Sequence, residues 1–194
     1  MSLLTWKGGT LEAPLPPVLV SCGTMDKPNA LTIAWTGIVN TDPPMTYISV
    51  RPERYSYDII KESGEFVINL PTEAMVRAID FCGVRSGRNM NKIETCGLSL
   101  EPGETVSAPL IVESPIHLEC KVTQILPLGT HHMFLAKITA VRVDDRYVDE
   151  SGRLCMEKCH LAAYIHGTYY SIGKALGTFG FSVKKKKNNN RKQK

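Results

Sequence analysis

The sequence of 194 residues predicts a mainly β fold, an antiparallel β-barrel with peripheral helices. At least six segments have the composition and alternation of strands, and short connections join them. Helical segments are inserted between the strands without regular alternation, which disfavours a doubly wound parallel sheet. A closed or nearly closed barrel is favoured because closure also removes exposed strand edges.

A hairpin is predicted near the N-terminus. Residues 18–22 are mostly apolar and β-branched, and Gly23 ends this first strand. The polar cluster at residues 24–28 forms a tight turn into a second strand at residues 29–35. The two strands are therefore expected to pair antiparallel.

A returning strand is predicted next. The run at residues 40–44 contains Asn, Asp and two Pro residues and must turn the chain. Residues 47–50 then alternate like a strand. Two neighbouring strands would thus bring residues 29–36 and 49–56 to one place.

A short helix and a buried strand follow. Ser56 is predicted to cap a helix at residues 57–63, which Gly64 ends. Residues 66–70 are apolar on both faces, as in a fully buried strand. Pro71 then ends this strand.

A second helix is predicted after Thr72, which can cap it. Its apolar side chains fall on one face at helical spacing, namely Met75, Ala78, Ile79 and Cys82. Glu73, Arg77 and Asp80 lie largely elsewhere. The polar segment 83–87 breaks this helix, and residues 89–95 predict one or two further helical turns.

The C-terminal half predicts more strands. Residues 117–123 alternate as in a half-buried strand, with His117 and Glu119 on its polar side. A longer partner at residues 133–143 follows a turn that holds His131 and His132, expected to be an exposed pair. Residues 146–148 predict another strand.

Charge divides the chain into a single domain at residues 1–183 and a basic tail at residues 184–194. The formal net charge is +4, but the tail holds seven of the basic residues and no acid, so the body carries about −3. The tail is expected to be a solvated terminus. No apolar run approaches the roughly 20 residues of a membrane span. The sequence therefore predicts a cytoplasmic protein without a membrane or nucleic-acid partner.

Six cysteines are scattered along the chain without a secretory signal, which favours free thiols. Cys155 and Cys159 are separated by three residues rather than by the two typical of zinc knuckles, and no second ligand pair matches them. No metal site is predicted. A redox role of these two thiols stays open.

Basic and hydroxyl side chains suggest a site for an anion. Residues 51–56 offer two arginines, a serine and a helix start, which is the chemistry that a phosphate needs. Ser86 and Arg88, with Lys92 nearby, supply a second set. Neither segment matches a P-loop or a dinucleotide fingerprint, so a solvated loop is the alternative explanation for each.

Trp35 and Asn29 also have two explanations. A Trp at the end of an apolar strand is usually core, and an Asn after Pro is usually a turn residue. If a planar ring such as a flavin bound here, the strand would supply hydrogen-bonding groups and an apolar wall from Thr32, Ala34, Trp35 and Thr36.

Several motifs in fixed order identify a family resemblance. They are residues 29–35, Arg51-x-x-Arg54-Tyr-Ser56, residues 64–71, Phe81-Cys-Gly83-x-x-Ser86-Gly-Arg88 and Tyr169-x-x-x-Gly173. Together they resemble the flavin reductase-like family, most closely its flavoredoxin branch, from about Pro17 to Gly180. The resemblance implies an FMN-binding split barrel with Greek-key antiparallel strands, assembled as a homodimer with a flavin site near each subunit interface.

The resemblance also implies which residues surround FMN. The ring and ribityl chain would lie along one strand and the start of the next, and the phosphate near the following helix and loop. The implied residues are Asn29, Thr32, Ala34, Trp35, Thr36, Ser49, Arg51, Tyr55, Ser56, Cys82, Ser86 and Lys92. Arg54 and Arg88 are further candidates that could instead point to solvent.

The function implied is an FMN-dependent oxidoreductase that passes reducing equivalents from NAD(P)H or a ferredoxin-like redox protein to an acceptor. The flavin would carry the chemistry, so no side chain is assigned as a catalytic acid or base. The alternative is an FMN-binding electron carrier or redox-responsive binding module without turnover. A third hypothesis makes the basic tail a nucleic-acid contact, against which the acidic balance of the body argues.

Overall fold

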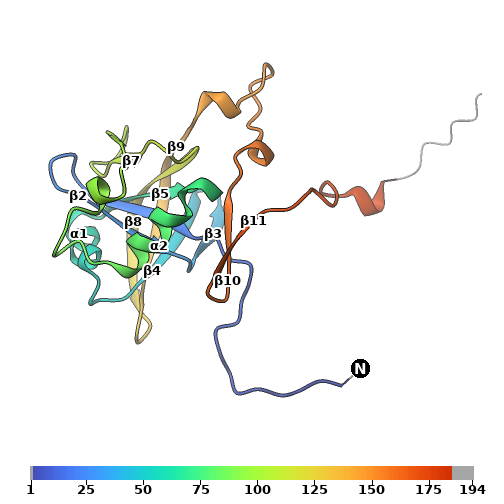
Figure 1. The fold of residues 1–194 in the computed structure, drawn as a ribbon, viewed down its shortest axis with the longest axis horizontal. Helices are drawn as coiled ribbons and strands as arrows, with labels where there is room; N and C mark the ends of the chain where they lie inside the picture. The colour runs from blue at the N-terminus through green and yellow to red at the C-terminus, as the bar shows by residue number, and fades with distance from the viewer. Residues whose placement is uncertain (1, 185–194) are drawn as a thin grey trace, which may run out of the picture.

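The computed structural model describes residues 2–184 and is built on one antiparallel sheet of seven strands in the order β2-β1-β5-β8-β9-β4-β3 (Figure 1). A mainly β fold is thus confirmed. The strands of this sheet are β1 (Val18–Gly23), β2 (Pro28–Ile33), β3 (Thr36–Thr41), β4 (Pro44–Val50), β5 (Glu65–Leu70), β8 (Ile116–Pro127) and β9 (His132–Val143).

Helices and short strands surround this sheet. The α-helices are α1 (Tyr55–Ser63), α2 (Val76–Val84) and α3 (Lys92–Thr95), and the short strands are β6 (Leu100–Glu101), β7 (Leu110–Ile111), β10 (Ala162–Ile165) and β11 (Thr168–Ser171). Short 3₁₀ helices are η1 (Glu73–Met75), η2 (Asp145–Tyr147), η3 (Met156–Lys158) and η4 (Phe181–Val183). None of the helices within residues 2–184 is long and apolar enough to cross a membrane.

The sheet curls until its two ends meet. Its first and last members, β2 and β3, are consecutive in the chain and separated only by Ala34 and Trp35. The main-chain N–H of Ser49 in β4 donates to the carbonyl of Trp35 at 3.0 Å and extends the β3–β4 pairing to the link between β2 and β3. The two ends of the sheet are therefore joined by this short chain link, and no strand pairing connects β2 to β3 in the part of the chain that the structure describes.

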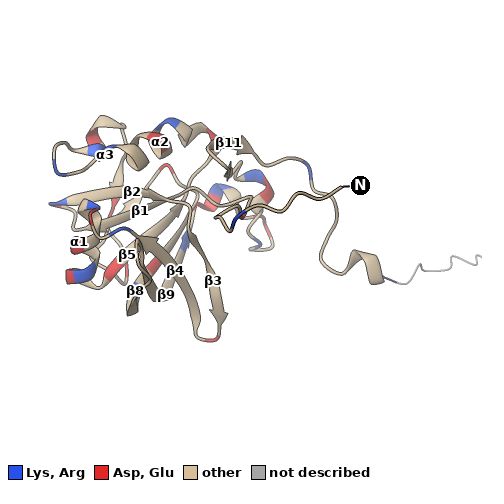
Figure 2. Ribbon diagram, turned by 90° about the horizontal axis from the view of Figure 1, so that it is seen from below, with Lys and Arg blue, Asp and Glu red and all other residues tan. Residues whose placement is uncertain are grey.

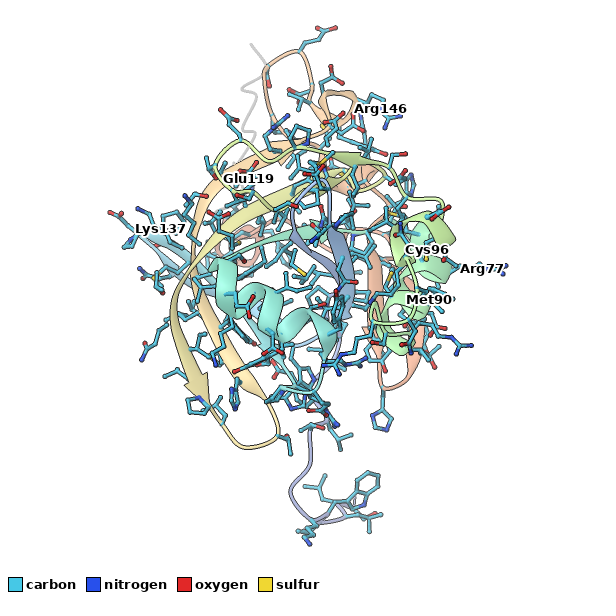
Figure 3. All side chains as sticks on the ribbon, turned by 90° about the vertical axis from the view of Figure 1, so that its left-hand side faces the viewer. Arg77, Met90, Cys96, Glu119, Lys137 and Arg146 are labelled. Carbon is cyan, nitrogen blue, oxygen red and sulfur yellow. The ribbon has the colours of Figure 1, made fainter. Side chains whose placement is uncertain are left out.

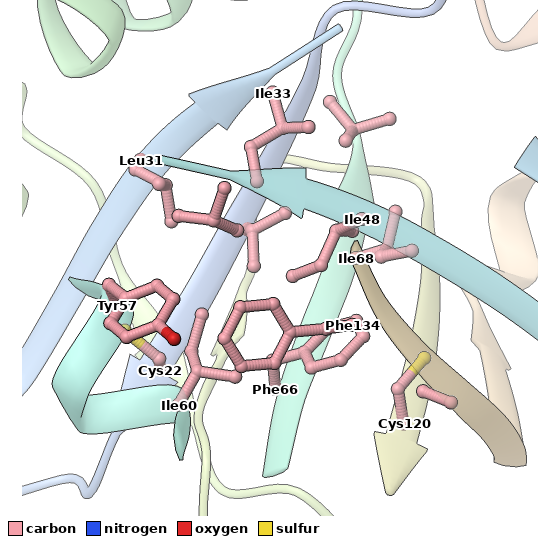
Figure 4. Packing of buried hydrophobic residues seen from close by; sticks show 14 of the residues in the cluster. Cys22, Leu31, Ile33, Ile48, Tyr57, Ile60, Phe66, Ile68, Cys120 and Phe134 are labelled. Atoms are coloured by element: carbon pink, nitrogen blue, oxygen red, sulfur yellow. The ribbon is translucent and has the colours of Figure 1, made fainter. Parts of the chain in front are cut away.

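One hydrophobic cluster fills the barrel and a second lies under the helices. Val18 and Val20 of β1 point inward to the first cluster, which contains Phe66 and Phe134 (Figure 4). Leu19, on the opposite face of β1, packs in the second cluster beneath α2 and α3. Burial of each large side chain contributes about 1.5 to 3 kcal/mol. This two-sided burial fixes the register of β1, because a shift by one residue would exchange its faces.

Some predicted boundaries are corrected by local hydrogen bonding. The strand expected at residues 146–148 is wrong: η2 occupies this place because the Asp144 carboxylate accepts from the N–H of Arg146 and stabilises a turn. The strand β3 was not predicted. Its Gly37, Asn40 and Thr41 read as turn residues, yet β3 pairs with β4 along its length.

The predicted caps of both helices are also wrong. The helix α1 begins at Tyr55 with Arg54 as N-cap, because the Ser56 hydroxyl bonds to Asn29 instead. Thr72 makes no side-chain cap, and the one-turn helix η1 precedes α2. Gly64 does end α1 in the left-handed conformation, as predicted, with φ of 68°.

The first part of the polar side of β8 is buried rather than solvated, whereas Lys121 and Thr123 are exposed. His117 and Glu119 were expected to face solvent, but the loop before β7 covers Glu119, and His117 is buried and bonds to Asn69 Oδ1 at 2.8 Å. The predicted free thiols are confirmed for all six cysteines. Of the predicted basic tail, all but Lys184 lies outside the described residues.

Candidate functional site

Two adjoining cavities lie where the barrel closes, and they share Leu31, Arg51 and Arg54. The aromatic cavity, of about 380 Å³, is lined by Thr32, Ala34, Trp35, Ser49, Asp80, Gly83, His131, Tyr164 and Tyr169, among others. The basic cavity, of about 300 Å³, is lined by Glu53, Tyr55, Ser56, Arg85, Ser86, Gly87 and Lys92. Together they form one elongated site.

Aromatic side chains from distant parts of the chain bound the aromatic cavity. The rings of Trp35, between β2 and β3, and His131, in the turn between β8 and β9, lie 4.4 Å apart. The rings of Tyr164 and Tyr169, on β10 and β11, lie 5.3 Å apart. Burial and the nearby Arg51 lower the pKa of His131, so its imidazole is neutral at pH 7.

Lys92 is the buried cation of the basic cavity and is only 4 % exposed. Its ammonium donates to the carbonyls of Cys82 and Arg85, both at 3.3 Å. Within residues 2–184 no carboxylate lies within salt-bridge distance of it. Burial lowers the pKa of Lys92, because a charge away from water is costly unless it is balanced. A bound anion would balance it.

A packed group of small polar side chains supports the basic cavity. The Asn29 amide donates to the Ser56 hydroxyl at 2.6 Å. The loop of residues 85–87 presses on this pair, because a Cβ on Gly87 would lie 2.2 Å from Asn29 Oδ1. Only glycine therefore fits at this wall, which brings the main chain of the loop close to the cavity.

Arginine side chains also line the basic cavity. Figure 2 shows α2 and α3 on the side of the sheet next to β1 and β2. Arg51 pairs with Glu53 at 3.4 Å, and both side chains are exposed. Arg54 borders both cavities from the start of α1. The basic cavity therefore combines one buried cation with exposed ones that water and salt can screen.

Most of the residues implied by the resemblance meet at this site. Thr32, Ala34, Trp35 and Ser49 line the aromatic cavity, and Tyr55, Ser56, Ser86 and Lys92 line the basic one, with Arg51 at both. Asn29, Thr36 and Cys82 line neither. Asn29 lies behind Ser56, and the Thr36 hydroxyl donates to the Tyr47 carbonyl at 2.6 Å. The Cys82 thiol is buried under α2, and its carbonyl holds Lys92.

Other lining residues were missed. His131 was expected to be exposed, and Asp80 was placed only off the packed face of its helix. Tyr169 belonged to a quoted motif without a role, and Arg85 lay in a segment read as a helix break. Arg54 lines both cavities, whereas Arg88 lines neither. Only Tyr169 could have been found from the sequence, because it belongs to a family motif. The other residues reach the cavity only through the tertiary fold.

The fold and the site define a class of protein. A curled antiparallel sheet carries two adjoining cavities, with aromatic side chains in one and a buried cation without a carboxylate partner among residues 2–184 in the other. This donor set fits a planar ring system that bears an anionic group. The class is therefore a split-barrel binding protein for such a ligand.

Comparisons with known proteins identify the family. The model of the "Flavin reductase like domain" family matches residues 11–173. An uncharacterised protein of Archaeoglobus fulgidus is 32% identical over 136 residues, covering 70% of this chain and 76% of that protein. This chain belongs to the flavin reductase-like domain family.

Solved structures place it within the family. Flavoredoxin of Desulfovibrio vulgaris (Miyazaki F) has a TM-score of 0.86 and 31% identity, covering 94% of this chain and 100% of that one. Flavoredoxin of Methanosarcina acetivorans has a TM-score of 0.86 and 26% identity, covering 95% and 100%. The predicted family, near flavoredoxin, and the split-barrel fold are thus confirmed.

Proposed function

We propose that this protein is an FMN-binding oxidoreductase that passes reducing equivalents from NAD(P)H or a redox protein through bound flavin to an acceptor. The observation that carries the proposal is Lys92, a buried ammonium that lines a cavity adjoining an aromatic one. Family membership and the flavoredoxin structures support the choice of a flavin.

FMN fits the division of the site. Its phosphate would lie in the basic cavity, where Lys92 supplies charge and Ser56 and Ser86 supply hydroxyl groups. The ring would lie in the aromatic cavity along the segment from Thr32 to Trp35. When bound, FMN supplies the redox chemistry, since its ring accepts and releases electrons.

The side chains of this chain would bind and orient the cofactor. Trp35 and His131 would border the ring on one side of the aromatic cavity, and Ser49 fixes the strand edge through its bond to Trp35. Lys92 is held by two main-chain carbonyls and is thus positioned before any ligand arrives, which reduces the ordering cost of binding.

The absorbance spectrum tests the cofactor. Purified protein should be yellow with a flavin spectrum, or should take up added FMN in a fluorescence titration. Riboflavin, which lacks the phosphate, should bind more weakly. A colourless protein that takes up no FMN would contradict the proposal.

A non-catalytic electron carrier is the second candidate, and the exposed mouth of the site favours it. Trp35 is 39% exposed, which would let a redox protein approach the ring. Anaerobic stopped-flow mixing separates the two functions. Rapid bleaching of flavin absorbance by NADH or NADPH supports the reductase; bleaching by reduced ferredoxin alone supports the carrier.

We also propose that the protein acts as a homodimer. Support comes from two extended arms that leave the barrel and carry exposed apolar side chains (Figure 1). These include Leu3, Leu4 and Trp6 in the N-terminal arm and Leu176, Phe179 and Phe181 in the C-terminal arm. Such surfaces usually mark contacts between proteins. Light scattering should give twice the chain mass of 21.5 kDa; the mass of one chain would contradict the proposal.

A further inference from the structure

Asp80 and Tyr169 form a polar pair in the aromatic cavity that the FMN assignment does not use. Asp80 comes from α2 and Tyr169 from β11, and the Tyr169 hydroxyl donates to Asp80 Oδ1 at 3.3 Å. Burial and the adjacent Asp80 carboxylate raise the pKa of Tyr169 to about 12, so the phenol keeps its proton at neutral pH. The pair therefore offers one donor and one acceptor side by side.

The contact between the two side chains is longer than an optimal one. A hydroxyl that donates to a carboxylate usually lies at about 2.5 to 2.7 Å, so a separation of 3.3 Å is a weak bond. A ligand with complementary groups can replace it at small cost. This argues against a role for the pair as a structural tie alone.

The position of Tyr169 also favours a ligand contact. The hairpin of β10 and β11 forms a two-stranded sheet of its own. Main-chain bonds between Leu15 and Tyr164, at 2.8 and 2.9 Å, join it to the segment before β1. The hairpin also packs on the second hydrophobic cluster, which includes Ala162 and contacts Tyr169. Tyr164 and Tyr169 thus line the aromatic cavity from outside the seven-stranded sheet, together with Thr32 and Trp35 of the segment assigned to the flavin.

A primary carboxamide matches this pair, because its N–H group can donate to Asp80 while its carbonyl accepts from Tyr169. Resting on the proposed FMN function, we propose that Asp80 and Tyr169 recognise the carboxamide of a nicotinamide dinucleotide and so determine the electron donor. The exposed Arg51 and Arg54, where the two cavities meet, are placed for the phosphates of the dinucleotide.

Equilibrium binding to FMN-loaded protein tests the pair. Oxidised dinucleotide, NAD⁺ or NADP⁺, is titrated while the flavin absorbance is followed, so the readout is independent of turnover. Tyr169→Phe and Asp80→Ala should each weaken dinucleotide binding about tenfold, while FMN affinity changes by less than about threefold. The matched control is Tyr170→Phe, because Tyr170 neighbours Tyr169, is 48% exposed and does not line the cavity. It should bind the dinucleotide like the parent protein.

An analogue separates the two members of the pair. The 3-acetylpyridine dinucleotide keeps the carbonyl of the carboxamide but replaces its NH₂ with a methyl group. The parent protein should bind it more weakly than the natural dinucleotide. Asp80→Ala should abolish that preference, because it removes the acceptor for the N–H group, whereas Tyr169→Phe should retain it.

Three other results would overturn the inference, and a fourth would overturn the proposed function on which it rests. An unchanged preference in Asp80→Ala would show that Asp80 does not contact the carboxamide. An equal loss of FMN affinity in both variants would assign the pair to the flavin instead. A parent protein that holds FMN but binds neither dinucleotide would overturn the donor assignment and leave the FMN function standing. Failure of the parent protein to bind FMN would instead overturn the proposed function itself.

Discussion

Two buried charged side chains, Glu119 and Lys92, are partnered in opposite ways. The Glu119 carboxylate is fully buried and accepts from the main-chain N–H groups of Glu104 and Thr105 and from the Thr105 hydroxyl. Lys92 has only two long bonds to carbonyls and no carboxylate partner among residues 2–184.

The difference separates a buried charge that the chain itself satisfies from one that the described residues leave unbalanced. Burial alone would raise the pKa of Glu119, but its hydrogen bonds outweigh burial and hold the pKa below its ordinary value. For Lys92, burial dominates and lowers the pKa. In the view of Figure 3, the labelled Glu119 lies to the left of the labelled Cys96, which follows α3. Glu119 is thus satisfied by the chain itself, whereas under the proposed function the FMN phosphate would balance Lys92.

Removal of Glu119 should have the largest effect. Glu119→Ala leaves several donors without an acceptor and should lower the free energy of unfolding by about 3 to 5 kcal/mol. Urea denaturation measures this loss, and the exposed Glu101→Ala serves as the control, within about 0.5 kcal/mol of the parent. If Glu119→Ala lowered the free energy of unfolding by less than about 1 kcal/mol, Glu119 would not stabilise the fold as this comparison with Lys92 requires.

The pH dependence of stability should come from β8, the strand that carries Glu119. Burial, followed by Arg142, lowers the pKa of His117 to about 4. The unfolded chain, with a His pKa of about 6.5, therefore takes up the proton first. Stability present above about pH 6.5 should be lost by about 3 kcal/mol as the pH falls toward 4. His117→Gln should flatten this decline; parallel curves for the two proteins would contradict the assignment.

Lys92 should affect binding rather than folding. Lys92→Met should weaken FMN binding by about 1.5 to 3 kcal/mol, roughly 10- to 150-fold, because a charge-assisted bond is lost. Riboflavin affinity should stay constant, and the apo protein should not lose stability, since an unbalanced buried charge is removed. Lys27→Met in the exposed β1–β2 turn is the control. Equal weakening of FMN and riboflavin would argue against a phosphate contact.

Arg51 should have the smallest effect. Its side chain is 53% exposed and paired with Glu53, so Arg51→Ala should weaken FMN binding by only about 0.2 to 1 kcal/mol. The effect should shrink further in titrations at high salt, because exposed charges are screened. A loss as large as that of Lys92→Met, independent of salt, would place Arg51 inside the phosphate site.

The parts of the fold that depend on a local sequence pattern could be predicted from the sequence. Strand composition located β1, alternation located most of β8, and Gly64 located the end of α1. The sequence could not reveal that His117 and Glu119 are buried, because their partners, Asn69 and the loop at Glu104, are brought to β8 only by the tertiary fold. The strand β3 was missed because it contains residues that favour turns. Its pairing with β4 outweighs this local preference.

The candidate site divides in the same way. Basic and hydroxyl side chains near the start of α1 and before α3 were visible as clusters, so Ser56, Ser86 and Lys92 could be named. His131 and Asp80 are single residues in unremarkable patterns, and only the closure of the barrel brings them to the cavity. Residues that only the tertiary fold brings together show no characteristic spacing in the sequence.

The pairing of Leu15 with Tyr164 has a consequence for synthesis of the chain. One wall of the aromatic cavity consists of residues near the end of the domain, held by a residue that leaves the ribosome early. The barrel can form from β1 to β9 before that wall exists, and such sequence-distant contacts are slow to form. The cavity is therefore completed only after β11 has been made, so a nascent barrel remains open on that side until translation is nearly finished.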